Sequence, residues 1–254
     1  MNYRIQQQIS KVARKLLGYD QRALARMRSE DRVVVEEIKA RKLTYLSNSK
    51  LESVINAVRG ITENNIHGVF VETGCALGGS AILISKLKED VRPLRIYDVF
   101  GMIPAPTEED TTDVQKRYEE IQQGKSKGIG GDKYYGYEDN LYEMVEANLA
   151  RFGIDCKTQH VELIRGLLQD TMVVDGPVAF AHIDVDWYEP VKVSLERIVP
   201  HLPVSGVLII DDYRDWGGCK QATDEYFSDK ASQFDMDDSA SSLKITRLQA
   251  ACDP

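Results

Sequence analysis

The sequence contains few cysteines, and their spacing argues against the common cysteine sites. Four cysteines occur in 254 residues, at positions 75, 156, 219 and 252, and no two of them form a C-x-x-C pair. A structural zinc site or a thioredoxin-like redox pair is therefore not expected. Cysteines without a disulfide framework are typical of a reducing compartment, so we expect a cytoplasmic protein.

Long apolar runs are also absent. No run of about 18 or more apolar residues occurs, so no membrane-spanning helix is expected. The first twenty residues, MNYRIQQQISKVARKLLGYD, have neither an uninterrupted apolar centre nor a small-residue cleavage site. They therefore do not have the pattern of a secretory signal.

Positive charge is scarce outside the N-terminal region. Residues 1–43 contain eleven Lys and Arg against five Asp and Glu, whereas the whole chain has a net charge of −8, which leaves −14 for residues 44–254. An acidic body argues against nucleic acid as a partner.

The N-terminal region has a helical pattern of its own. Apolar residues recur at helical spacing from Ile5 to Leu17, with basic residues between them. Such a helix could lie on an anionic membrane surface, but we favour docking on its own domain or on a second copy of the chain. We therefore expect a homodimer or a higher homo-oligomer. Residues 1–65 are predicted to be a helical extension, and residues 66–254 the main domain.

From residue 68 onward, short apolar runs alternate with helical stretches. Near-continuous apolar strands alternating with helices indicate an α/β fold, with a parallel sheet covered on both faces. Residues 242–248 alternate between apolar and polar, as a late antiparallel strand would. The expected strands are residues 68–73, 93–100, 160–166, 177–184 and 205–212, and the expected helices are 79–89, 139–152, 188–200 and 217–228.

One long polar segment, residues 103–138, interrupts this alternation. It contains a cluster of glycines and lysines and follows the second predicted strand, at the sheet edge where α/β folds place ligands. Long loops in compact domains are usually functional lids or flexible segments. The sequence leaves both interpretations open.

The stretch VETGCALGGS, residues 71–80, indicates a ligand-binding turn between a strand and a helix. Glycines such as Gly74 let a ligand approach the backbone, and the helix start offers free N–H groups. Asp98 ends the next strand, 24 positions after Gly74, where dinucleotide sites keep the acid that binds ribose hydroxyls. A ribose-bearing cofactor is expected, either a nicotinamide nucleotide or S-adenosylmethionine. The alternative is a turn that only packs helix on strand, with Asp98 as a cap.

Four aspartates follow two neighbouring predicted strands. Asp184 and Asp186 follow one, and Asp211 and Asp212 end the next. Consecutive parallel strands share a carboxyl edge, so these carboxylates should meet there, and with no basic neighbours in sequence they call for Mg, Ca or Mn. The alternative is that some of them cap strand ends. His182, inside the strand, is expected to be a hydrogen-bonded core residue.

Several of these stretches together resemble one enzyme family. FVETGCALGGS, IYDVFGMIP, RGLLQDT, HIDVDWYEPVKVSLERIVPHL and GVLIIDDYRDWGGCKQATDEYF are similar to segments of the macrocin O-methyltransferase family, over roughly residues 35–230. The resemblance implies the S-adenosylmethionine methyltransferase fold, with a mostly parallel sheet and one antiparallel strand. It also implies transfer of a methyl group from S-adenosyl-L-methionine to a hydroxyl, with the help of Mg2+.

The resemblance also implies roles for individual residues. The family pattern D-G-D-[LW]-Y matches residues 184–188, with Val185 where glycine is usual. By this match Asp184, Asp211 and Asp212 are the Mg2+ ligands, and Asp186 or Asp184 is the general base. The implied cofactor contacts are Glu72, Gly74, Cys75 and Ser80 in the turn, Asp98 at the ribose, Leu167 and Asp170 beside adenine, Asp184, and Thr44 and Tyr45 in an upstream loop.

We therefore predict a Mg-dependent O-methyltransferase. Its partner is expected to be a small hydroxylated acceptor, a sugar or a glycosylated natural product, and not nucleic acid or a membrane. The rival enzyme class is a nicotinamide-dependent oxidoreductase, which has no evident use for four aspartates. A calcium-stabilised interaction protein is the non-enzymatic rival. The segment 103–138 departs most from the family and leaves the identity of the acceptor open.

Overall fold

The computed structural model describes residues 18–249. The amphipathic positions from Ile5 to Leu17 of the predicted N-terminal helix lie outside these residues. None of the described helices is both long enough and apolar enough to cross a bilayer.

Seven strands form one sheet in the order β3-β2-β1-β4-β5-β7-β6. The first five strands run parallel, and β7 is antiparallel to both of its neighbours. The mostly parallel sheet with one antiparallel strand is thus confirmed. The strands are β1 (Val69–Thr73), β2 (Leu94–Asp98), β3 (Val161–Arg165), β4 (Val178–Ile183), β5 (Val207–Ile210), β6 (Phe234–Asp237) and β7 (Leu243–Arg247).

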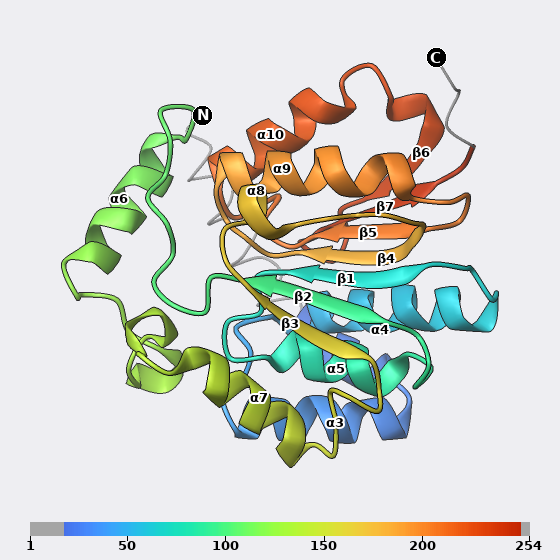
Figure 1. Ribbon diagram of the computed structural model, residues 1–254, viewed down its shortest axis with the longest axis horizontal. Helices are drawn as coiled ribbons and strands as arrows, with labels where there is room; N and C mark the ends of the chain where they lie inside the picture. The colour runs from blue at the N-terminus through green and yellow to red at the C-terminus, as the bar shows by residue number, and fades with distance from the viewer. Residues whose placement is uncertain (1–17, 250–254) are drawn as a thin grey trace.

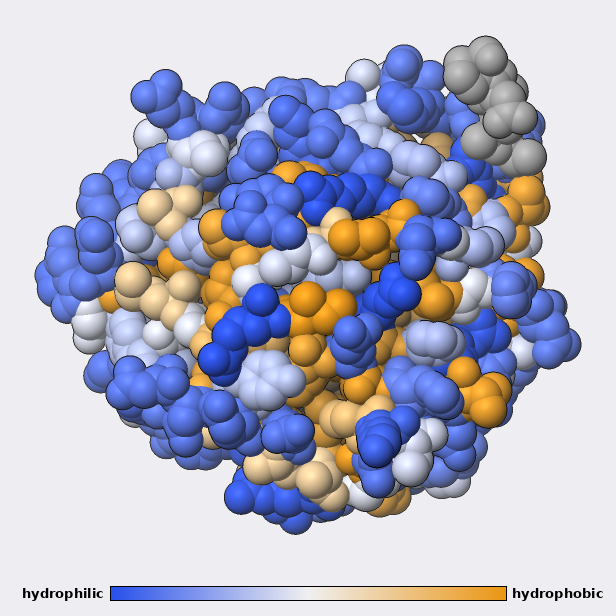
Figure 2. Space-filling view, in the orientation of Figure 1, coloured by the Kyte–Doolittle hydropathy of each residue, from blue (hydrophilic) through white to orange (hydrophobic). Residues whose placement is uncertain are grey.

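Helices cover both faces of the sheet (Figure 1). One face carries α3 (Ser29–Ala40), α4 (Asn48–Glu63), α5 (Gly79–Leu87) and α7 (Leu141–Arg151), with α2 (Tyr19–Arg26) packed on α4. The other face carries α8 (Leu168–Thr171), α9 (Tyr188–Ile198) and α10 (Gly217–Phe227). Each face has its own apolar core. The surface in Figure 2 is hydrophilic over most of its outline, and apolar residues gather toward its centre.

The helix α4 shows how the sequence builds these layers. Ser47 caps its start by accepting a hydrogen bond from the Lys50 backbone N–H at 3.3 Å. Leu51, Val54 and Val58 recur at helical spacing and are fully buried against the sheet. Residues 18–65 therefore include a helix that belongs to the main core.

Two features of the sheet fix where a ligand can bind. The strand order reverses between β1 and β4, which makes a crevice at the carboxyl ends of these strands. The register places Thr73 beside Ile183, and Ile183 beside Ile210. The residues that follow these three positions therefore meet at one edge.

The segment 103–138 is structured, which the sequence alone left open. It contains α6 (Thr112–Gln122) and two short 3-10 helices, η1 (Ile129–Gly131) and η2 (Tyr135–Tyr137). In Figure 1 it lies beyond the carboxyl ends of the parallel strands. Two further short helices, η3 (Val199–His201) and η4 (Ala231–Gln233), connect elements farther along the chain. The elements α6, α8 and β6 were not predicted from the sequence.

Candidate active site

A cavity of about 470 Å³ opens at the carboxyl edge of the sheet. It runs from the turn after β1 to the ends of β4 and β5, and α6 and η2 close its outer side. Most of the predicted site residues line it: Thr44, Tyr45, Gly74, Cys75, Ser80, Asp98, Leu167, Asp184, Asp186, Asp211 and Asp212.

The turn after β1 needs a glycine for two reasons. Gly74 has a φ of +78°, and a Cβ at this position would lie 1.9 Å from the backbone oxygen of Asp184. The upstream loop packs against the same region, because the N–H of Gly79 donates to the Leu43 carbonyl at 3.1 Å. This contact places Thr44 beside the start of α5, in the cavity wall.

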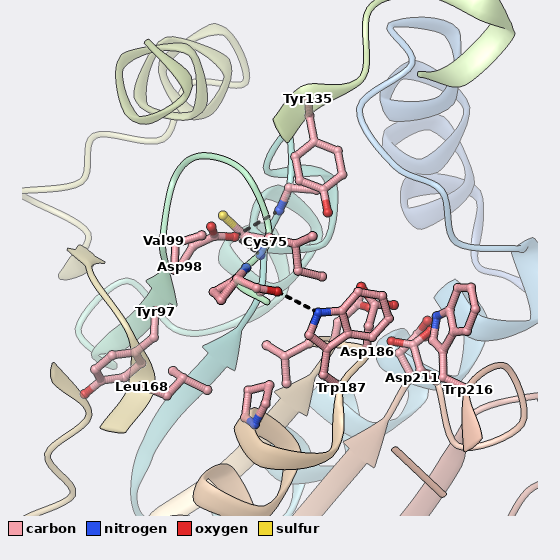
Figure 3. Close-up of a pocket in the computed structure, with 18 of the residues that line it drawn as sticks. Cys75, Tyr97, Asp98, Val99, Tyr135, Leu168, Asp186, Trp187, Asp211 and Trp216 are labelled. Carbon is pink, nitrogen blue, oxygen red and sulfur yellow. Dashed lines mark hydrogen bonds between the residues drawn. The ribbon is translucent and has the colours of Figure 1, made fainter. Parts of the chain in front are cut away.

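Asp98 is held by backbone groups of two loops, the turn after β1 and the loop that follows β2. One of its carboxylate oxygens accepts the Cys75 N–H at 2.8 Å, and the other accepts the Phe100 N–H at 2.7 Å. Burial raises the pKa of Asp98, and these hydrogen bonds offset part of the rise. The side chain is thus fixed in orientation at the cavity wall, as Figure 3 shows.

Two of the predicted cofactor residues lie elsewhere. Asp170 is exposed and outside the cavity lining, whereas its neighbours Leu167, Leu168 and Gln169 line the cavity. Glu72 is completely buried beneath the site and is also absent from the lining. The N–H group of Gly166 donates to the Asp98 carbonyl at 3.0 Å. This bond holds the loop between β3 and α8 beside the end of β2.

Three carboxylates converge at the other end of the cavity. Asp184, Asp186 and Asp212 each offer an oxygen within 4.8 Å of the other two. Burial and the neighbouring Asp211 raise the pKa of Asp184 to about 7, and burial raises that of Asp186 to about 6. Burial and the charge of Asp186 hold the pKa of Asp212 well above its usual range. Like charges crowded in this way are costly without a cation.

The fourth aspartate has a partner that the sequence analysis missed. Lys50, from the first turn of α4, donates from Nζ to Asp211 at 2.6 Å and to Asp215 at 2.8 Å. Burial on its own would raise the pKa of Asp211, but the nearby Lys50 and His182 bring it down to about 2. The position of Lys50 four residues before Val54, on the buried stripe of α4, was the available signal.

His182 is the buried polar residue that the sequence predicted. Its Nδ1 lies 3.1 Å from Glu72 Oε1, on the adjacent strand, and its Nε2 lies 3.8 Å from Asp211 Oδ1. Burial disfavours a charged imidazole, but the carboxylates of Asp211 and Glu72 raise the pKa of His182 to about 10. His182 therefore lies between Glu72 and Asp211, beneath the cavity.

Aromatic side chains form the outer wall. Tyr45 contacts Tyr135 with ring centroids 5.9 Å apart, and Tyr134 and Tyr135 are 4.4 Å apart. Trp187 and Trp216 meet edge to face at 5.7 Å and lie beside Asp186 and Asp211 in Figure 3. Tyr188, in contrast, bonds to Glu225 at 2.6 Å and lies outside the cavity lining.

Comparison with known proteins identifies the family. Residues 2–240 match the family described as Macrocin-O-methyltransferase (TylF). The chain belongs to the macrocin O-methyltransferase family. This membership makes the protein an O-methyltransferase and gives no support to the oxidoreductase alternative.

Two known O-methyltransferases are similar in sequence to most of this chain. Demethyldecarbamoylnovobiocin O-methyltransferase of Streptomyces niveus is 27% identical over 202 residues, covering 77% of this chain and 70% of the relative. The 8-demethyl-8-(2,3-dimethoxy-alpha-L-rhamnosyl)-tetracenomycin-C 4'-O-methyltransferase of Streptomyces olivaceus is 26% identical over 204 residues, covering 76% and 72%. The solved O-methyltransferase NovP has the same fold, with a TM-score of 0.67, 24% identity and coverage of 82% and 83%.

Proposed function

We propose that this protein transfers a methyl group from S-adenosyl-L-methionine to a sugar hydroxyl of a glycosylated natural product, with the help of Mg2+. The observation that carries the proposal is one cavity with a fixed aspartate, Asp98, at one end and three converging carboxylates at the other. Family membership supports the reaction type. The rhamnosyl group in the name of one relative supports the choice of a sugar acceptor.

The cofactor end fits a ribose-bearing methyl donor. Asp98 is a fixed carboxylate acceptor for ribose hydroxyls, and Leu167 and Leu168 offer apolar surface for a base beside it. Gly74 and Cys75 line the cavity between Asp98 and Asp184. A positively charged sulfonium is electrostatically compatible with that acidic end.

The carboxylate end fits a divalent cation. The donor set is all oxygen, and Asp212 Oδ2 and Asp211 Oδ1 are buried without a hydrogen-bond partner. We assign Asp184 and Asp212 as ligands, because they belong both to the family-implied set and to the converging set. Asp211 is the third family-implied ligand, through the oxygen that Lys50 leaves free.

The chemistry follows from these positions. A bound Mg2+ would lower the pKa of a coordinated hydroxyl. Asp186 lies beside the ligands, and we assign it the hydroxyl proton, which leaves the oxygen free to attack. The oxygen–carbon bond forms as the carbon–sulfur bond of the donor breaks. Most of the rate gain then comes from holding oxygen and methyl carbon in line.

The aromatic outer wall of the cavity fits a sugar-bearing acceptor. Tyr45 and Tyr135 line the cavity in front of the buried rings of Tyr134 and Trp187, and this apolar wall suits the hydrocarbon faces of a sugar or a planar aglycone. Tyr45 keeps 48% of its surface exposed, so ring area remains open to a ligand. No nucleic-acid partner is proposed for this acidic chain.

A labelled-methyl screen tests the proposal. The protein is incubated with Mg2+, methyl-deuterated S-adenosylmethionine and a panel of glycosylated natural products with free sugar hydroxyls. Mass spectrometry should find the label on an oxygen of the sugar. Label on carbon or nitrogen, or on the aglycone alone, would contradict the proposed acceptor.

A further inference from the structure

The helices α9 and α10 both begin at the active site. In neither helix does the side chain of the N-cap residue bond to the free N–H groups of the first turn. Trp187 is the N-cap residue of α9 and Trp216 that of α10, and neither side chain makes a capping hydrogen bond. An indole has no acceptor for the free N–H groups of a helix start. Asp186 directly precedes Trp187, and Asp212 begins the turn that ends at Trp216. The two helix starts are therefore the chain segments that directly adjoin these carboxylates.

The segment 103–138 supplies the missing cap of α9. Asp110 Oδ1 accepts the Tyr188 N–H at 2.8 Å, and its Oδ2 accepts the Thr107 N–H at 3.0 Å. Asp110 is 7% exposed, so this is a buried contact between a carboxylate and the positive end of a helix. The same side chain thus folds its own turn and holds the start of α9.

Two more contacts tie the segment to the same pair of loops. Asp113 Oδ2 accepts the Gly217 N–H at 3.3 Å, at the start of α10. The Trp187 indole donates from Nε1 to the Pro104 carbonyl at 3.0 Å, drawn as a dashed line in Figure 3. Trp187 is only 2% exposed as a result of this packing.

Glycines on α10 make room for these contacts. A Cβ at Gly218 would lie 2.1 Å from Asp110 Oδ1, and a Cβ at Gly217 would lie 2.4 Å from Thr111 Oγ1. Neither glycine has a positive φ, so the backbone there does not require glycine. The close approach of the segment is therefore the structural reason for these two glycines in a helix.

We propose that Asp110 is a positioning residue, which holds Asp186 and Trp187 in their working geometry by capping α9 from the segment 103–138. Asp113 acts in the same way on α10. The inference rests on the proposed function in one respect, namely that the carboxylates at the ends of β4 and β5 take part in the reaction. Since Asp110 makes no hydrogen bond to the turn at Gly74 or to Asp98, the cofactor end should be independent of it.

The two tryptophans allow a test that needs no acceptor and no turnover. Trp187 and Trp216 are the whole tryptophan content of the chain, so fluorescence excited at a wavelength that tryptophan absorbs and tyrosine does not reports on these two helix starts. Acrylamide quenching is measured well below the melting temperature in the full chain and in Asp110→Ala, Asp110→Asn and Gly218→Ala. Calorimetric titration with Mn2+ and with S-adenosylmethionine follows for each. Asp155→Ala is the control, because Asp155 also accepts backbone N–H groups, of Lys157 and Thr158, but on an exposed loop.

We expect Asp110→Ala and Gly218→Ala to increase quenching and to weaken Mn2+ binding roughly 10-fold, the lower end for loss of a residue around a metal site, because Asp186 lies beside the proposed ligands and is not one of them. Asp110→Asn keeps an acceptor oxygen and should restore part of both. S-adenosylmethionine affinity should stay unchanged. The proposal is overturned if Asp110→Ala and Gly218→Ala keep wild-type quenching and Mn2+ affinity, or if they differ from wild type only in melting temperature, as Asp155→Ala should. Because fluorescence needs neither donor nor acceptor, this outcome is separate from failure of the proposed reaction.

Discussion

Lys50 is a buried cation beside the carboxylates, and its loss leaves Asp211 without the cation that it is hydrogen-bonded to. In Lys50→Met, Asp211 stays buried while its bond at 2.6 Å disappears. Breaking a buried ion pair on one side typically costs about 3–5 kcal/mol, so we expect the free energy of unfolding to fall by about that amount. Urea unfolding followed by circular dichroism measures it.

Two further variants serve as controls for Lys50→Met. Lys157→Met changes an exposed lysine and should leave stability within about 0.5 kcal/mol. The pair Lys50→Met with Asp211→Asn should recover part of the loss, because the uncompensated charge is then gone. A double variant as unstable as the sum of the two single ones would show that the pair is not coupled.

Asp186 and Asp211 should separate chemistry from metal binding. Asp186→Asn removes the proposed proton acceptor and should slow turnover by about 10²–10⁴-fold, with a smaller loss of Mn2+ affinity. Asp211→Asn should weaken Mn2+ binding more than Asp186→Asn does. Initial rates and Mn2+ calorimetry on both variants decide the matter. Equal losses of affinity would make Asp186 a ligand, in agreement with its place in the converging set.

Among single residues, the sequence predicted the positions of those whose place depends on strand order. Asp98, Asp184 and Asp212 lie at or just after the ends of parallel strands, so their meeting at one edge follows from topology alone. Lys50 could not be placed in this way, because it comes from a helix 161 positions before Asp211 in sequence. Helix packing on the sheet, which the sequence does not specify, brings the two together.

Among the elements, the turn from β1 to α5 depends most on a single residue. Gly74→Ala puts a side chain at a φ of +78° and 1.9 Å from the Asp184 carbonyl. The backbone conformation alone should cost about 1–3 kcal/mol, and S-adenosylmethionine binding should be lost as β1 and β4 separate. Thermal unfolding and calorimetry measure the two effects.

Gly60→Ala is the matched control for Gly74. Gly60 lies inside α4 with open space where its Cβ would be, so alanine should stabilise the protein by about 0.5–1 kcal/mol. S-adenosylmethionine affinity should not change. If Gly74→Ala and Gly60→Ala bind S-adenosylmethionine equally well, the turn at Gly74 is not needed for cofactor binding.

The elements also show where sequence patterns are too weak. The five parallel strands were predictable because they are short apolar runs between helical stretches. In α6 the described side chains of Val114 and Ile121 are buried among polar neighbours, so its apolar stripe is narrow. Strand β6 has only four residues, two of them aspartate, which strands usually avoid.

For the whole molecule, the two ends of the cavity should respond separately to ligand removal. Excess EDTA should abolish methyl transfer but leave S-adenosylmethionine binding largely intact, because Asp98 and the turn at Gly74 contain none of the proposed metal ligands. Rates and calorimetry with and without EDTA check this, and added Mg2+ should restore turnover. Full activity in EDTA would remove the metal from the mechanism.

The predicted homo-oligomer concerns the whole chain and stays a prediction. Its basis is the amphipathic pattern in the first 17 residues, outside the described part of the chain. Light scattering on the full chain and on residues 18–254 measures the mass of each. A mass for the full chain equal to one copy would contradict the prediction.

The measurement that tests the central claim most directly is calorimetric titration of the full chain with S-adenosylmethionine and, separately, with NAD. The account predicts binding of S-adenosylmethionine, its loss in Asp98→Ala, and no binding of NAD. Binding of NAD without binding of S-adenosylmethionine would contradict it.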